Sequence, residues 1–158
     1  QDAPILMKEL IEWHRAESQE KSLHPVVVAA MLHYKFVRIH PFDDGNGRTG
    51  RILMVLQLIY YDVLAFPILY ISGYINDNRS EYYRLLRSVT KDGNWNEFIL
   101  FMLKGFYLQA RETKETFFKI MKLFFESKLI KFQNIDCARV PTSYKFNAIM
   151  KNVKPAII

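Results

Sequence analysis

Two nearly continuous apolar segments, separated by a short polar loop, constrain the fold of this chain more than any other feature. The first, VVVAAMLHYKFVRI, runs from Val26 to Ile39, and the second, RTGRILMVLQLIYY, from Arg48 to Tyr61. Neither alternates apolar and polar residues as a half-buried strand does, and Pro25 occupies a position favoured at the start of a helix. A helix that is apolar on nearly every face is buried on nearly every side. The sequence therefore predicts two central helices joined by a loop.

Amphipathic stripes predict further helices around this pair. Residues 4–17 carry one stripe, and a second helix is expected after an Asp77 or Asn78 cap. Asn94 and Glu97 are spaced to cap another helix that continues towards Lys128. The apolar positions of these three helices are Leu6, Leu10 and Trp13; Tyr82, Leu85, Leu86 and Val89; and Trp95, Phe98, Ile99, Met102 and Phe106. Around Pro67 we expect a short extended crossing. The predicted fold class is all-α.

Length and charge suggest one domain followed by a basic segment. A chain of 158 residues is the size of a single domain. Residues 1–99 hold 11 Lys and Arg against 12 Asp and Glu, whereas residues 100–158 hold 11 against 4. We predict a catalytic core over residues 1–129 and a basic C-terminal segment over 130–158, which Pro141 and Pro155 interrupt. This basic excess is interpreted first as a solvated helix face, with contact to DNA as the alternative.

The single cysteine and an apolar run over residues 52–75 indicate where in the cell the protein is expected. Cys137 cannot form an internal disulfide, so we expect a reducing compartment and a cytoplasmic protein. Residues 52–75 are apolar enough to raise the question of a membrane span. Gln57, Asp62 and Pro67 interrupt this run, which favours a buried helix and a following extended segment. No membrane contact is predicted.

The loop HPFDDGNGRTGR, residues 40–51, combines a base with a carboxylate. His40 is its only side chain that takes up a proton near neutral pH. Asp44 supplies a carboxylate for Mg²⁺, a cation that binds one or two protein carboxylates and shares phosphate oxygens. The loop therefore has the residues for proton abstraction beside a metal-bound phosphate.

The second half of the loop has the residues of an anion site. Gly45 and Gly47 allow a tight backbone, so that several N–H groups can point into one cavity at the start of the following helix. Arg48 and Arg51 are three residues apart and can clamp phosphates from one side of that helix. Asn46 can donate or accept hydrogen bonds beside them. Together the two halves predict phosphoryl or nucleotidyl transfer from a metal-bound nucleotide.

The loop resembles the motif of the Fic-domain family. That motif is HPF, a variable residue, Asp or Glu, GNGR, two variable residues and Arg, and every fixed position is met here. The preceding LHPVVVAAMLHYKFVRIHPF also resembles the family's lead-in helix, and the resemblance covers about residues 1–110. It implies an all-α Fic-type bundle with the catalytic loop between two buried central helices. It also implies protein adenylyltransferase activity, the transfer of AMP from ATP to a Ser, Thr or Tyr hydroxyl of a target protein.

The resemblance assigns a role to each loop residue. His40 is the general base, Asp44 holds Mg²⁺, and Arg51 reaches the γ-phosphate while pyrophosphate leaves. The anion hole consists of Gly45, Asn46, Gly47 and Arg48. Phe42 is expected to point its ring into the core and anchor the loop. Because the kinase-like branch of the superfamily has Lys at the position of Gly47, glycine there favours AMP transfer, with other nucleotidyl or phosphocholine transfer as the alternative.

Tyrosines and histidines outside the loop also have predicted roles. Tyr82 and Tyr83 resemble a pair that lines the adenine pocket in many Fic proteins, with Tyr83 the expected contact, although Tyr82 also belongs to an apolar stripe. The histidines outside the loop, His14, His24 and His33, are interpreted as structural.

Two features of the family's pattern are not found. In many Fic enzymes an inhibitory helix carries Ser or Thr, three residues, Glu, and then Gly or Asn, and its Glu pairs with the Arg equivalent to Arg51. None of the nine Glu residues here is followed by Gly or Asn, and no target-docking hairpin precedes residue 4. We therefore expect inhibition by a segment outside this chain or by an antitoxin-like partner protein. A nucleotide-controlled binding module that uses the basic C-terminal part is a second hypothesis.

Overall fold

The computed structural model describes the chain over residues 3–133, and its side chains up to residue 127. Within that range the chain forms six helices and no strand, which confirms the all-α class. These helices are α1 (Ala3–Glu20), α2 (Pro25–Ile39), α3 (Asn46–Tyr60), α4 (Ile71–Asp77), α5 (Arg79–Asp92) and α6 (Trp95–Gln133). Cys137 and the predicted segment from residue 134 onward lie outside the described residues.

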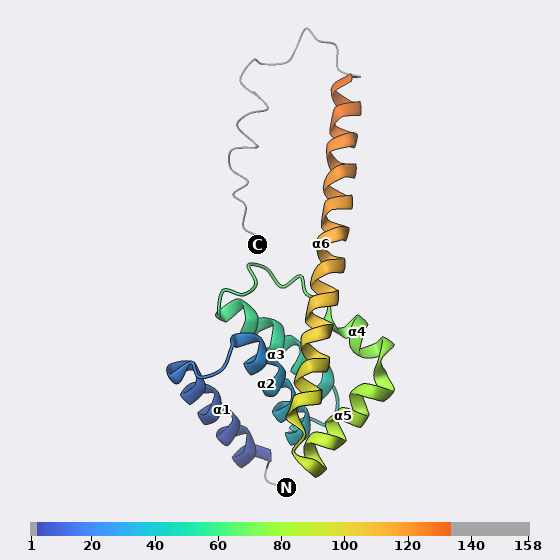
Figure 1. The fold of residues 1–158 in the computed structure, drawn as a ribbon. Coiled ribbons are helices and arrows are strands. Elements are labelled where there is room, and N and C mark those ends of the chain that lie inside the picture. The colour runs from blue at the N-terminus through green and yellow to red at the C-terminus, as the bar shows by residue number, and fades with distance from the viewer. Residues whose placement is uncertain (1–2, 134–158) are drawn as a thin grey trace. The chain divides into compact units, whose positions relative to one another are not determined.

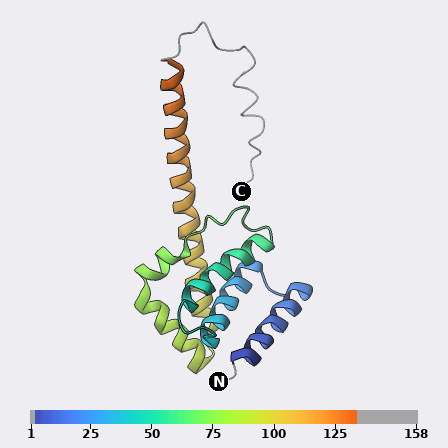
Figure 2. The same cartoon turned by 180° about the vertical axis from the view of Figure 1, so that it is seen from behind.

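Helices α2 and α3 occupy the middle of the fold, as their composition predicts. Figures 1 and 2 show α1 on one side of this pair and α4 and α5 on the other. Helix α2 begins at Pro25, and the ring of His24 accepts a hydrogen bond from the Val26 N–H at 3.3 Å. Proline suits this position because its missing N–H has no partner inside a helix anyway.

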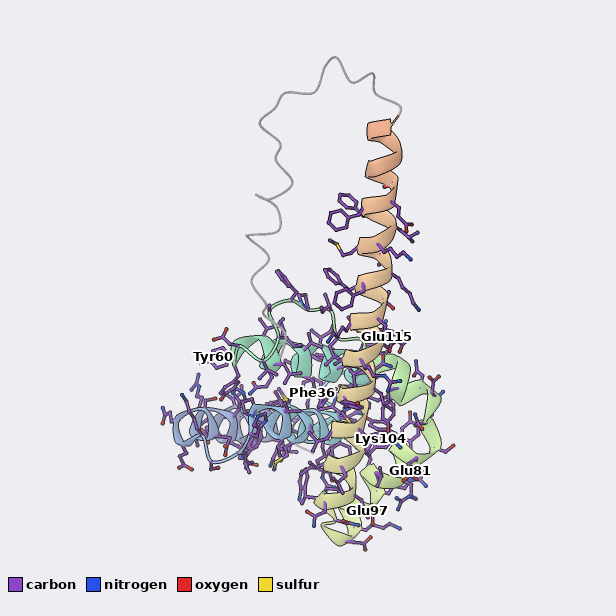
Figure 3. All side chains as sticks on the ribbon, turned by 45° about the horizontal axis from the view of Figure 1, so that its top comes forward. Phe36, Tyr60, Glu81, Glu97, Lys104 and Glu115 are labelled. Carbon is purple, nitrogen blue, oxygen red and sulfur yellow. The ribbon has the colours of Figure 1, made fainter. Side chains whose placement is uncertain are left out.

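Two apolar clusters bury the faces of the central pair. The larger joins α2 and α3 to α4, α5 and the start of α6, and its least exposed members are Ala29, Ala30, Met54, Leu85, Phe98 and Met102. The smaller lies between α1 and α2, with Phe36 (labelled in Figure 3), Leu32 and Leu10 at its centre. Helix α2 thus contributes buried side chains to both clusters, so its position is fixed from two sides.

The segment after α3 differs in part from the prediction. Residues 61–70 are irregular, but a helix of seven residues, α4, follows from Ile71 and was not predicted. It is too short to show a helical period in the sequence. Among residues 3–133 no helix is long and apolar enough to cross a membrane. Asn78 precedes α5 as predicted, but its side chain donates to the Tyr74 carbonyl at 2.9 Å and makes no capping bond to α5.

Helix α6 runs without a break from Trp95 to Gln133. The described chain divides into two compact units, one up to Thr116 and one from Phe117 onward. The predicted boundary at residue 130 falls near the end of this helix and stays a prediction. In the first unit Arg84 of α5 pairs with Glu81 at 2.7 Å and with Glu97 of α6 at 2.8 Å, and both acidic residues are labelled in Figure 3. This surface cluster fixes the turn between α5 and α6.

Gly105 marks the closest approach of α6 to α4. A Cβ built there would lie 2.4 Å from Cδ1 of Tyr74 and 3.0 Å from Cδ1 of Ile71, and both side chains are buried. We expect Gly105→Ala to lower the free energy of unfolding by about 1–3 kcal/mol through overpacking. Urea unfolding checks this, with Gly73→Ala as the control because its Cβ would meet nothing closer than 3.3 Å. Equal stability of the two variants would contradict the packing argument.

Candidate active site

The left-handed backbone of His40 ends α2 and turns the chain into the loop. This residue has φ 55° and ψ 57°, and its N–H donates to the Phe36 carbonyl at 3.1 Å. Residues with a side chain adopt this region at a cost of roughly 1–2 kcal/mol. Its side chain is exposed and Pro41 follows directly. The only histidine of the loop therefore lies at the surface, at the junction of α2 and the loop, where it can be reached by a reactant.

Asn46 holds the loop closed. Its Oδ1 accepts from the Phe42 N–H at 2.9 Å, and its Nδ2 donates to the Phe42 carbonyl at 2.5 Å. Only 3% of Asn46 is exposed, so both bonds are shielded from water. This side chain therefore fixes the loop geometry, a role that its residue type alone did not reveal.

The prediction that the Phe42 ring enters the core was wrong. Half of this residue is exposed, and its ring contacts Phe36 from the outside with centroids 6.1 Å apart. The backbone groups of Phe42, and not its ring, anchor the loop. The Asn46 amide forms hydrogen bonds with both the N–H and the carbonyl of Phe42, so the loop is held without burial of the ring.

The first turn of α3 leaves backbone N–H groups without a partner inside the helix. Gly45 precedes it with φ 85°, a conformation that glycine adopts without strain, and the first intrahelical bond runs from the Thr49 N–H to the Gly45 carbonyl. The N–H groups before Thr49 have no partner within the helix and carry the positive end of its dipole. No acidic residue lies in this turn. The turn therefore suits a negatively charged ligand.

Two guanidinium groups lie beside this turn. A Cβ on Gly47 would be 3.3 Å from Nη1 of Arg51, and one on Gly45 would be 3.7 Å from Nη2 of Arg48. Arg48 also pairs with Asp44 at 3.0 Å, and both of these side chains are largely exposed. The Nε of Arg51 is buried without a hydrogen-bond partner in the structure. A buried donor without a partner is unusual, and an anion at this turn would satisfy it.

His33 lies behind the loop, in the core. It is fully buried, and its Nε2 is 2.8 Å from the hydroxyl of Tyr82 on α5. On its other side, a Cβ on Gly50 would lie 2.9 Å from Nδ1 of His33, so glycine is what lets α3 approach α2 here. Burial lowers the pKa of His33 to about 4; the Gly50 backbone opposes this change and the charge of Arg51 adds to it. His33 is therefore a neutral, structural histidine, as predicted.

The lowered pKa of His33 predicts a stability change with pH. Because its pKa in the folded state lies below the ordinary value of 6.5, the unfolded chain binds more protons between about pH 7 and pH 4. The contribution of His33 to the free energy of unfolding is fully present above pH 7. It falls by about 2–3 kcal/mol when the pH is lowered to 4.5. Urea unfolding of wild type and His33→Leu at both pH values measures it. The same pH dependence in the two proteins would refute this assignment.

The two tyrosines of α5 have different environments. Tyr82 is 5% exposed, and burial raises the pKa of its hydroxyl well above the usual range. Tyr83 is 44% exposed, its ring lies 5.4 Å from that of Tyr82, and the Arg79 guanidinium lies 5.7 Å above its ring. Tyr83 alone of the pair presents a face to a ligand from solvent. The link between Tyr82 and His33 was missed, because these residues are 49 positions apart and no local pattern joins them.

The remaining histidines have structural partners. The His14 Nε2 lies 2.5 Å from Oε1 of Gln57, which joins α1 to α3, and His24 caps α2. Over residues 3–127 no group of three or more His, Cys, Asp or Glu side chains could hold a metal ion. A cation at the loop would therefore depend on Asp44 together with oxygens of a ligand.

Comparisons with known proteins agree with this geometry. The model of the Fic/DOC family matches residues 1–58. Protein adenylyltransferase Fic of Drosophila mojavensis is 42% identical over 103 residues, which are 64% of this chain and 18% of that protein; the protein of the same name from Drosophila grimshawi is 41% identical and is covered to 19%. This chain thus spans about a fifth of these relatives.

A solved structure extends the likeness to the fold. A Fic family protein from Desulfovibrio desulfuricans G20 has 34% sequence identity and a TM-score of 0.63, over 72% of this chain and 34% of that one. Sequence, fold and the loop at residues 40–51 are thus all similar to Fic proteins, and residues 1–58 match the Fic/DOC family.

Proposed function

We propose that this protein is a protein adenylyltransferase that moves AMP from Mg²⁺-bound ATP to a Ser, Thr or Tyr hydroxyl of a target protein. One observation carries the proposal. An exposed histidine ends α2, and the loop behind it leads within a few residues to a helix N-terminus flanked by two guanidinium groups. A base and an anion site at that spacing suit attack by a hydroxyl on a phosphate.

His40 accepts the proton of the attacking hydroxyl in the proposed reaction. The hydroxyl oxygen then forms a bond to the α-phosphorus, and the bond from that phosphorus to the oxygen bridging to the β-phosphate breaks. Pyrophosphate leaves, and the target retains the adenylyl group. Proton transfer to a positioned base contributes about 10²- to 10⁴-fold to such a rate.

The first turn of α3 binds the phosphates in this account. Backbone N–H groups of Gly47 and Arg48 face them, and the Arg48 guanidinium and Arg51 neutralise their charge. Support comes from the Arg51 Nε, which is buried without a hydrogen-bond partner among the described residues and could donate to a bound phosphate. The amide of Asn46 acts on Phe42 and so keeps the turn in place. The tight backbone at Gly45 and Gly47 leaves room for the phosphates.

Asp44 is the candidate ligand for the magnesium ion. Its side chain is 91% exposed, and among the described residues it pairs with the exposed side chain of Arg48. A single carboxylate fits Mg²⁺, which fills its other positions with water and phosphate oxygens. When bound, the ion neutralises phosphate charge and favours departure of pyrophosphate. For Asp44 to take this role, Arg48 moves from the carboxylate to the phosphates.

Tyr83 is the proposed contact for the adenine base. Its half-exposed ring can stack on a base. It follows Tyr82, whose hydroxyl lies 2.8 Å from His33 Nε2, and the other side of the His33 ring faces Gly50, the residue before Arg51. This arrangement distinguishes a nucleotide from a bare polyphosphate.

Labelled ATP tests the proposal directly. The protein is incubated with Mg²⁺ and a cell lysate, in parallel with ATP labelled at the α- or at the γ-phosphate. Transfer of AMP predicts protein-bound label from the α-labelled nucleotide alone. Label from the γ position would indicate a kinase reaction instead, and absence of ATP binding by wild type would remove the basis of the proposal.

A further inference from the structure

The hydrogen bond between His33 and Tyr82 connects the two halves of the proposed nucleotide site. Among the hydrogen bonds of the described side chains, two join α2 to α5: His33 Nε2 to the Tyr82 hydroxyl at 2.8 Å, and the Tyr34 hydroxyl to Thr90 Oγ1 at 2.9 Å. The first lies directly behind the phosphate-binding turn, since His33 also packs against Gly50 of α3. The second lies near the other end of α5.

We infer that Tyr82 is a positioning residue, which acts through its bond to the buried His33 to set the distance between the Tyr83 ring and the phosphate-binding turn of α3. This inference rests on the proposed function, because it assumes that Tyr83 contacts the base. It replaces the expectation that Tyr82 itself lines the adenine pocket. A side chain that is 5% exposed, with its hydroxyl used by His33, has no face left for a base.

The physical argument concerns rigidity. Tyr83 follows Tyr82 on the same helix, so a displacement of α5 at Tyr82 also moves Tyr83, and the two rings lie 5.4 Å apart. His33 bonds the Tyr82 hydroxyl on one side and packs against Gly50 on the other. Arg51 follows Gly50 on α3. A continuous series of contacts therefore runs from the phosphate-binding arginine through the core to the base-binding tyrosine.

The neutral state of His33 keeps this connection constant. Its imidazole is buried. The Tyr82 hydroxyl lies next to Nε2, the Gly50 backbone lies beside Nδ1 and the Arg51 cation is nearby, and no carboxylate is among these neighbours. The Gly50 backbone favours a second proton on the ring, but burial and the Arg51 charge outweigh it and keep the pKa of His33 low. His33 is consequently neutral near pH 7, and its bond to the Tyr82 hydroxyl is retained there.

Tyr82→Phe tests the inference, with Tyr34→Phe as the matched control. Both changes remove one buried hydroxyl that bonds α2 to α5, and both tyrosines are 5% exposed. Binding of ATP and of inorganic triphosphate is measured by calorimetry for wild type and both variants, well below their melting temperatures. We expect Tyr82→Phe to weaken ATP binding about tenfold and to leave triphosphate binding within about twofold. Tyr34→Phe should leave both affinities within about twofold.

The outcomes separate this inference from the proposed function. Equal loss of ATP affinity in the two variants would show that α2–α5 packing in general is responsible, and would overturn the positioning role. Equal loss of ATP and triphosphate affinity in Tyr82→Phe would also overturn it, because the phosphate turn would then be affected as well. If wild type binds ATP normally, the proposed function stands in either of these cases. If wild type binds neither ATP nor triphosphate, both the proposed function and the positioning role of Tyr82 are refuted.

Discussion

Replacing His40 with alanine is expected to lower the rate of AMP transfer by about 10²–10⁴-fold or more, with ATP affinity within about twofold of wild type. The rate falls because no other titratable base is present in residues 41–51 except the carboxylates of Asp43 and Asp44. The affinity is retained because the phosphate site is built from the first turn of α3 and its arginines. Single-turnover transfer of labelled AMP and calorimetric titration with ATP measure the two quantities separately.

The left-handed backbone at His40 requires a second variant. Histidine tolerates φ 55° better than alanine does, so a loss of activity in His40→Ala could also come from the loop backbone. His40→Asn removes the base but keeps a residue type that tolerates this conformation, and it should be equally inactive. His24→Ala, at the opposite end of α2, serves as the control and should transfer at the wild-type rate. An active His40→Asn protein would show that His40 is needed for its conformation and not as a base.

Asn46→Asp is expected to reduce both stability and transfer, although it changes a single atom of the side chain. The carboxylate can still accept from the Phe42 N–H, but its second oxygen faces the Phe42 carbonyl in place of a donor. A buried charge beside an unpaired carbonyl should lower the free energy of unfolding by about 3 kcal/mol. Loss of the loop geometry should lower the transfer rate by about 10²-fold, since displacements of about 1 Å have effects of that size.

Urea unfolding and label transfer check this second prediction. Asn96→Asp, an exposed asparagine in the first turn of α6, is the matched control and should change stability by less than about 0.5 kcal/mol. Acidification adds a further check, because a protonated carboxyl at position 46 can again donate to the Phe42 carbonyl. The stability difference from wild type should therefore shrink as the pH falls. A difference that grows on acidification would contradict the assigned hydrogen bonds.

The central part of the fold follows from the sequence because its helices are apolar on nearly all faces. Helix α2 begins at Pro25 and ends at Ile39, as its composition and the proline predict. Helix α4 was missed because seven residues do not establish a period, and its position depends on packing of Tyr74 against α6. The predicted extended crossing falls on residues 61–70, which form turns and irregular backbone, and the prediction did not include the helix that follows.

The chemistry predicted for the loop rests on its residue types, whereas the contacts that support the loop could be found only in the structure. His40 and Asp44 carry functional groups that few structural loops need together. The support by Asn46 depends on which backbone atoms the loop brings within reach, and the mistaken expectation for Phe42 came from treating an apolar residue as a buried one. The pairing of His33 with Tyr82 arises from the approach of two helices far apart in the chain. Such contacts are properties of the folded structure.

Mass spectrometry of a protein modified in the presence of Mg²⁺ and ATP tests the central claim most directly. The account predicts a mass increase of one adenylyl group on a Ser, Thr or Tyr side chain, formed together with pyrophosphate by wild type and not by His40→Ala. The same modification formed equally by both proteins would contradict the role of the loop at residues 40–51. Addition of a phosphate group in place of the adenylyl group would contradict the proposed orientation of the nucleotide.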